Sequence, residues 1–245
     1  MKEGSMSETM VQQSGHRGAR AQWDWNLWFR WVLANAIGEV VGLGTAAVVG
    51  VGLAWTIEKT MGAFGSLAMA GVMILVGTLE GIVVGIAQWL VLRRPIQNMS
   101  WRVWVLATAI GAFVAWTLGM IPSTLMATNT AAAAAAAPPP EMSDVVMYGL
   151  AALMGAVLGP ILGLPQWLVL RRHVQKAGWW VLANAAAWAL GMPVVFIGAS
   201  SAPPGGFGLG VVVVGIVTGA SAGAVVGAVH GLALVWLLQP HHVEA

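Results

Sequence analysis

Two glutamates and one histidine stand inside long apolar segments, where ionisable residues are rare. Glu39, Glu80 and His230 are each surrounded in the chain by Gly, Ala, Val, Leu and similar residues. An ionised, unpaired carboxylate inside a membrane is costly, so such residues commonly mark proton or ion pathways. A buried imidazole is also able to ligate a metal or a haem iron. These three are therefore the candidate intramembrane functional residues.

Each of them also has a purely structural explanation. A buried Glu is able to stay protonated and hydrogen-bond a backbone carbonyl or Asn35. His230 stands where the corresponding segments carry glutamine, which favours a hydrogen-bonded structural histidine. At 1.5 Å per residue, Glu39 lies about 12 Å and Glu80 about 20 Å in from the ends of their segments. These depths argue against direct contact between the two carboxyl groups, although a water could bridge them.

The composition places these residues in a membrane protein. Hydrophobic residues make up 58% of the 245 positions and charged residues 8%, whereas soluble domains carry roughly 25% charged residues. The apolar runs each exceed the roughly 20 residues that cross a bilayer as a helix. The first twenty residues are polar, without the apolar core of a signal peptide. The chain has no cysteine, which excludes disulfides and thiolate ligands.

We predict six membrane-spanning helices, because the segments are too long and too uniformly apolar for barrel strands. The expected spans are Leu27–Ile57, Ala63–Leu92, Trp101–Met126, Val145–Leu170, Trp179–Ala199 and Gly208–Leu238. They form one membrane domain over residues 23–240, between a polar N-terminal segment (1–22) and a short tail (241–245). An Ala/Pro loop (128–143) is expected between the third and fourth spans.

The sequence contains three repeats of a two-helix unit. The motif QWLVLRR occurs at Gln88–Arg94 and at Gln166–Arg172. The motif WVLANA begins at Trp31 and at Trp180, and its variant WVLATA begins at Trp104. The repeats span about 27–94, 101–172 and 179–240. Because each repeat contains two spans, all three share one orientation in the membrane.

The second helix of each repeat carries three glycines at intervals of four residues. They are Gly77, Gly81 and Gly85; Gly155, Gly159 and Gly163; and Gly219, Gly223 and Gly227. Three residues after the last glycine stands Gln88, Gln166 or His230, and the four positions fall within about 80° of arc on a helix. Small residues at this spacing let helices approach closely in lipid. We therefore predict a pseudo-threefold bundle of three hairpins with the glycine faces turned inward.

A polar residue in the first helix of each repeat lies at the depth of the Gln or His in the second. The pairs are Asn35 with Gln88, Thr108 with Gln166, and Asn184 with His230. We expect each pair to form a polar clamp between antiparallel neighbours, worth about 0.6–2 kcal/mol.

The basic residues predict the orientation of the chain. Of the 11 lysines and arginines, all except Lys59 fall on the side that holds both termini. By the positive-inside rule, both termini are expected to be cytoplasmic in a bacterial inner membrane. The pairs Arg93–Arg94 and Arg171–Arg172 are expected to contact anionic lipid headgroups. Eight tryptophans on the same boundary predict an aromatic belt: Trp23, Trp25, Trp28, Trp31, Trp101, Trp104, Trp179 and Trp180.

The unit QWLVLRR…GWWVLANA resembles repeats in uncharacterised bacterial multi-pass membrane proteins. In those repeats Gln-Trp-Leu-x-Leu-Arg closes one span and Trp-x-x-Ala-Asn opens the next. The matching residues here are Gln88–Arg94, Gln166–Arg172 and Trp179–Ala185. The resemblance covers most of the chain, but the last hairpin has lost Gln-Trp and Arg-Arg. It implies a multi-pass membrane fold and no particular activity.

Three functions are open, and an enzyme is not among them. The sequence has no HExxH, P-loop, GxSxG or Ser/His/Asp cluster, so we predict no catalytic residue, metal site, cofactor or nucleic-acid partner. The first expectation is a scaffold or accessory subunit that contacts lipid or other membrane proteins. The alternative is a small transporter or ion/proton pathway using Glu39 and Glu80. The third is a pigment- or haem-binding protein, with His230, Gln88, Gln166 or a Glu as axial ligand to a ring stacked among tryptophans. The deeper tryptophans Trp55, Trp116 and Trp188 could pack such a ligand.

Overall fold

The computed structural model describes residues 23–61, 65–134, 142–203 and 208–239, and every regular element in these ranges is a helix. The helices are α2 (Trp25–Met61), α3 (Gly65–Leu92), α4 (Trp101–Ala134), α5 (Asp144–Leu170), α6 (Trp179–Ser200) and α7 (Leu209–Leu237). Each predicted span is found as one helix, and all six are long and apolar enough to cross a membrane. The chain is therefore an α-helical integral membrane protein.

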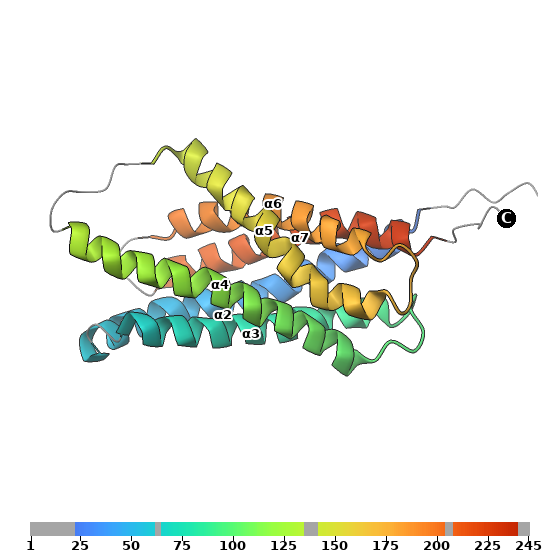
Figure 1. The fold of residues 1–245 in the computed structure, drawn as a ribbon, viewed down its shortest axis with the longest axis horizontal. Coiled ribbons are helices and arrows are strands. Elements are labelled where there is room, and N and C mark those ends of the chain that lie inside the picture. The colour runs from blue at the N-terminus through green and yellow to red at the C-terminus, as the bar shows by residue number, and fades with distance from the viewer. Residues whose placement is uncertain (1–22, 62–64, 135–141, 204–207, 240–245) are drawn as a thin grey trace, which may run out of the picture.

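The six helices form a closed ring in chain order. Each helix packs against its two neighbours in sequence, and α7 closes the ring against α2. Among the described residues, no helix packs across the ring, so its middle is left to side chains and a cavity. The contact between α4 and α5 is the smallest, and Figure 1 shows these two helices diverging at the end away from the C-terminus.

The beginning of α2, the end of α7 and two similar turns lie at one end of the ring (Figure 1). The turns follow α3 and α5, and each begins with an exposed arginine pair. Asn98 and Lys176 stand five positions after Arg93 and Arg171, and their φ angles are 64° and 55°. A left-handed residue other than glycine is uncommon, so its recurrence at the same offset makes the two turns alike.

Glycine-lined surfaces bring the helices together in pairs. The nine glycines of the repeated stripe are all buried. A Cβ on Gly223 would lie 2.6 Å from the backbone oxygen of Asn35, and one on Gly159 would overlap the backbone at Asn184. Through these surfaces α3 packs on α4, α5 on α6, and α7 on α2.

This arrangement corrects one sequence prediction. The glycine faces were predicted to turn inward toward a common axis, but each packs on the first helix of the next hairpin. The physical reason is that a residue without a side chain gains dispersion contacts only where another backbone reaches it. In this ring the close approach occurs at the seams between neighbouring helices, and the centre is hollow.

The outer surface of the ring is apolar, as a lipid-facing surface must be. Its exposed side chains come from successive helices and include Leu75, Leu79, Leu106, Leu153, Leu182 and Leu190. The charged side chains Arg93, Arg94, Arg171 and Arg172 are exposed at the end that holds the two turns.

The predicted Ala/Pro loop (128–143) is partly helical. Helix α4 continues through Ala134, because alanine has the highest helix propensity of all residues. Residues 135–141 lie outside the described part of the chain, as do the polar segment 1–22 and the tail 241–245. The side chains of Trp55 and Lys59 also lie outside the described part.

Candidate functional site

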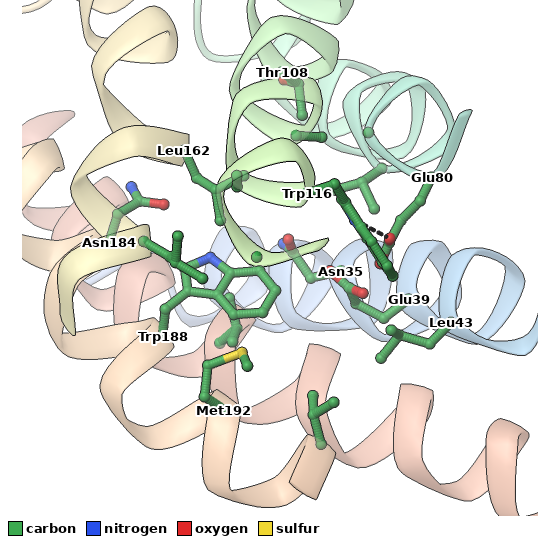
Figure 2. A pocket seen from close by; sticks show the side chains of 18 of the residues that line it. Asn35, Glu39, Leu43, Glu80, Thr108, Trp116, Leu162, Asn184, Trp188 and Met192 are labelled. Atoms are coloured by element: carbon green, nitrogen blue, oxygen red, sulfur yellow. Dashed lines mark hydrogen bonds between the residues drawn. The ribbon is translucent and has the colours of Figure 1, made fainter. Parts of the chain in front are cut away.

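A chamber of ≈ 360 Å³ lies inside the ring, and all six helices contribute to its lining (Figure 2). This volume falls within the range of roughly 300–1,000 Å³ that is usual for small-molecule sites. The described lining contains two acidic residues and one histidine but no lysine or arginine. The apolar part of the lining includes Leu43, Val84, Leu158, Leu162, Val195 and Phe196.

Three tryptophans pack beside one another at the end of the ring near the chain termini. Trp31, Trp104 and Trp180 are each 0% exposed, and the ring centroids of Trp180 lie 5.8 Å from Trp31 and 6.5 Å from Trp104. These three were predicted to belong to the aromatic belt, and that prediction is wrong. The indole N–H groups of Trp31 and Trp180 donate to His230 and Gln166 inside the bundle. The members of the predicted belt that are exposed are Trp23, Trp25, Trp101 and Trp179.

A ring of buried polar side chains lies between these tryptophans and the chamber. Gln88 Nε2 donates to Asn35 Oδ1 at 2.9 Å, and Gln166 Nε2 donates to Thr108 Oγ1 at 3.0 Å. The same Gln166 nitrogen also donates to Gln88 Oε1 at 3.1 Å. The structure therefore brings together two of the three expected clamp pairs and joins them to each other.

The third expected clamp, Asn184 with His230, is not hydrogen-bonded. Trp31 Nε1 donates to His230 Nδ1 at 2.8 Å, and Asn184 Nδ2 donates to the backbone oxygen of Trp180 at 2.9 Å. The buried indole of Trp31 needs an acceptor, and a neutral imidazole has only one acceptor nitrogen. His230 supplies that acceptor to Trp31, just as Gln166 Oε1 accepts from Trp180 Nε1 at 3.0 Å.

These bonds from tryptophan to glutamine or histidine were not predicted from the sequence. A signal for them was present, because Trp31 and Asn35 are one helical turn apart and share a face. Trp104 and Thr108 are also one helical turn apart. Trp104 Nε1, however, is buried without a hydrogen-bond partner.

Glu39 and Glu80 lie together on one wall of the chamber, where the Glu80 side chain packs over Gly42, one helical turn from Glu39 (Figure 2). Glu39 is 4% exposed and Glu80 is 8% exposed. Trp116 Nε1 donates to Glu80 Oε2 at 3.0 Å, whereas Glu39 Oε2 is buried without a hydrogen-bond partner. The wall thus combines a satisfied and an unsatisfied carboxyl oxygen.

The two glutamates lie closer together than expected from their depths, which argued against direct contact. The expectation assumed that side chains at different depths stay apart. Glycines on α2 let α3 approach closely, since a Cβ on Gly38 would lie 3.2 Å from the Cα of Val84. A Cβ on Gly42 would overlap the Glu80 side chain. The space at Gly42 therefore accommodates the stem of Glu80 and lets its carboxyl reach Glu39.

Two adjacent carboxyl groups in buried, largely apolar surroundings repel each other when both are ionised. No basic side chain lines the described wall to neutralise them. The pair therefore has to hold at least one proton or a cation. That is the chemistry that the site offers.

The described residues do not favour a metal or haem site. No group of three His, Cys, Asp or Glu side chains able to hold a metal ion occurs among them. The Nδ1 lone pair of His230 is occupied by Trp31, so a neutral His230 carries its proton on Nε2. His230 then has no free lone pair with which to ligate an iron.

The arginine pairs lie outside the chamber, near the membrane boundary. Arg93 stacks over the ring of Trp89 at 5.4 Å, and Arg171 stacks over Trp167 at 5.0 Å. Such cation–π contacts hold a guanidinium close to an interfacial aromatic ring. Arg94 and Arg172 are exposed beside them, and none of the four arginines contributes to the chamber lining.

Comparison with protein families, curated proteins and solved structures finds no match to this chain. Function is therefore inferred from the chamber and its lining residues.

Proposed function

We propose that this chain is a small transporter or an ion or proton pathway, and that Glu39 and Glu80 are its working residues. The observation that carries the proposal is the placement of two buried glutamates together on the chamber wall, with the Glu80 side chain packed over Gly42. Carboxyl groups inside a membrane protein typically mark ion pathways and proton relays. One of their oxygens, Glu39 Oε2, is left free to bind a proton or a cation.

From the sequence alone, a scaffold or accessory subunit was favoured over a transporter, and the proposed function reverses that order. A scaffold or accessory subunit needs an outer surface but neither an internal chamber nor a buried acid pair. The chamber therefore favours transport over the scaffold. The pigment- or haem-binding alternative is weakened because His230 Nδ1 accepts from Trp31.

We also propose that the ring is built from three equivalent hairpins related by a pseudo-threefold axis along the membrane normal. The three glycine-lined seams support this relation, since each joins the second helix of one repeat to the first helix of the next. The bonds from Trp31 to His230 and from Trp180 to Gln166 cross two of these seams in the same way. The departures from the pattern then mark the site, because Glu39 and Glu80 occur in the first hairpin alone.

The orientation proposed from the sequence places both termini in the cytoplasm of a bacterial cell. It is supported by the exposed bases at the end where α2 begins and α7 ends: Arg93, Arg94, Arg102, Arg171, Arg172 and Lys176. The positive-inside rule weighs such bases close to the ends of spans. We propose that these arginines contact anionic lipid headgroups, that the chain is not an enzyme, and that it binds no nucleic acid.

Flux measurements on the purified protein in liposomes test the transport role. We expect the wild-type protein to dissipate an imposed proton or monovalent-cation gradient faster than protein-free liposomes do. The double variant Glu39→Gln, Glu80→Gln keeps the shape of both side chains but removes the ionisable groups. Its flux is therefore expected to fall to the level of protein-free liposomes.

The matched control is Asp144→Asn, which removes an exposed carboxylate in the first turn of α5, outside the chamber. Its flux is expected to equal that of the wild type. Absence of wild-type flux under either gradient, or equal flux in the double variant, would exclude the proposed transport role.

A further inference from the structure

We infer that the solute of this site is a hydrophobic monovalent organic cation, of the substituted-ammonium class, held between the acid pair and the aromatic side chains of the chamber. The inference rests on the transport role proposed for Glu39 and Glu80 and names the kind of solute. It follows from the charge of the wall, the chemistry of the remaining lining and the size of the cavity.

The charge of the wall matches a single positive charge. Glu39 and Glu80 are neighbours on the chamber wall, and two neighbouring carboxyl groups that hold one proton carry one negative charge between them. Trp116 already donates a hydrogen bond to Glu80, while Glu39 Oε2 has no donor although it is buried. An ammonium group beside Glu39 would supply the missing positive partner.

The rest of the lining suits a cation that carries its own apolar surface. Figure 2 shows Trp116 beside Glu80, and Trp188 extends from α6 on another side of the chamber. Aromatic faces attract substituted ammonium groups through cation–π interactions. Three methionines also line the chamber, Met120, Met154 and Met192, and their flexible thioethers adapt to ligands of varied shape.

A bare metal ion fits this lining poorly. Calcium takes six to eight oxygen ligands and magnesium keeps several waters. Near the acid pair, the described lining is mainly Leu43, Val84 and the indole of Trp116. The side-chain oxygen of Asn35, one turn from Glu39, already accepts from Gln88. An organic cation avoids this difficulty because it is weakly hydrated and fills the cavity with its own alkyl or aryl groups.

The described residues close the chamber at one end and are partly exposed where they line it at the other. Toward the chain termini, the polar ring and the three packed tryptophans are buried. The lining residues toward the opposite end, including Gly119, Met120 and Phe196, are partly exposed. A ligand of one ring and one ammonium group is consistent with the volume of ≈ 360 Å³.

Equilibrium dialysis of radiolabelled benzyltrimethylammonium against the protein in nanodiscs tests this inference. We expect saturable binding to the wild type above the background of empty nanodiscs. Glu39→Gln and Glu80→Gln are each expected to weaken binding about tenfold or more, because each removes a charge-assisted contact. Asp144→Asn is expected to bind as the wild type does. Benzenesulfonate, an anion with the same ring, is expected not to compete.

The outcomes separate this inference from the proposed function. Flux that depends on the glutamates, without saturable benzyltrimethylammonium binding, would leave the transport role standing and overturn the assignment of the solute. Binding that depends on the glutamates, without flux under any gradient, would support the ligand class and refute transport. Equal binding by the wild type and both glutamine variants, or displacement by benzenesulfonate, would overturn the inference.

Discussion

Replacing Gly159 by alanine is expected to destabilise the folded protein by about 3 kcal/mol, at the upper end of the usual cost of overpacking. A Cβ at this position would overlap the backbone of α6 at Asn184 and lie 2.8 Å from the Cα of Ala185. A backbone cannot turn aside as a flexible side chain can, so α5 and α6 would have to separate. Thermal unfolding in detergent measures the loss.

The matched control for this variant is Gly149→Ala on the same helix. Nothing lies within 4 Å of a Cβ at Gly149, and alanine in a helix is favoured over glycine by roughly 0.5–1 kcal/mol. Gly149→Ala should therefore unfold at the wild-type temperature or slightly above it. If Gly159→Ala proved as stable as Gly149→Ala, the glycine-lined seam between α5 and α6 would be refuted.

Replacing Gln166 by leucine is expected to have the other large effect, also about 3 kcal/mol or more. Gln166 accepts from Trp180 and donates to both Gln88 and Thr108. Leucine has a similar size but makes none of these bonds. Each buried polar atom left without a partner costs about 1–3 kcal/mol.

The control for this variant is Gln175→Leu, which changes an exposed glutamine in the turn after α5. It should leave the unfolding temperature nearly unchanged. A second variant, Trp180→Phe, removes the indole donor, so Gln166→Leu should cost about 1 kcal/mol less in that background. Additive effects of the two substitutions would contradict a hydrogen bond between Trp180 and Gln166.

Much of the fold could be predicted from the sequence because the membrane restricts the choices. Unbroken apolar segments must be helices in lipid, and the polar or proline-rich breaks between them set their ends. The glycines at intervals of four residues correctly indicated buried faces. The helix that packs on each glycine face was not predictable. The spacing of the glycines on α5 shows which face of α5 is buried, but it does not identify the neighbouring helix.

The candidate site was less predictable, because it depends on distances across helices. Counting residues placed Glu39 and Glu80 at different depths, but the count ignored the space left by Gly42 and the close approach at Gly38. The bundle was expected to have its glycine faces turned inward, and no chamber was predicted. Its chamber results from ring closure by α7 against α2, which no local pattern in the sequence reports.

The placement of the tryptophans shows the same limit. Trp25 and Trp31 both lie near the start of α2, and their positions along the chain predict the same interfacial role. Trp25 is 60% exposed, whereas Trp31 is 0% exposed and donates to His230. The difference is rotational, since Trp31 shares the face of Asn35 and Trp25 does not. Reading each tryptophan together with the residue one turn ahead would have found the buried set.

Labelling with dicyclohexylcarbodiimide, a hydrophobic reagent that modifies protonated carboxyl groups in apolar surroundings, tests most directly whether Glu39 and Glu80 form one acid pair open to the chamber. Mass spectrometry of the labelled protein in native-like membranes identifies the modified residue. We expect the label on Glu39 or Glu80, and we expect benzyltrimethylammonium to reduce it. Failure of the reagent to modify either glutamate would contradict an acid pair that is protonated and accessible inside the ring.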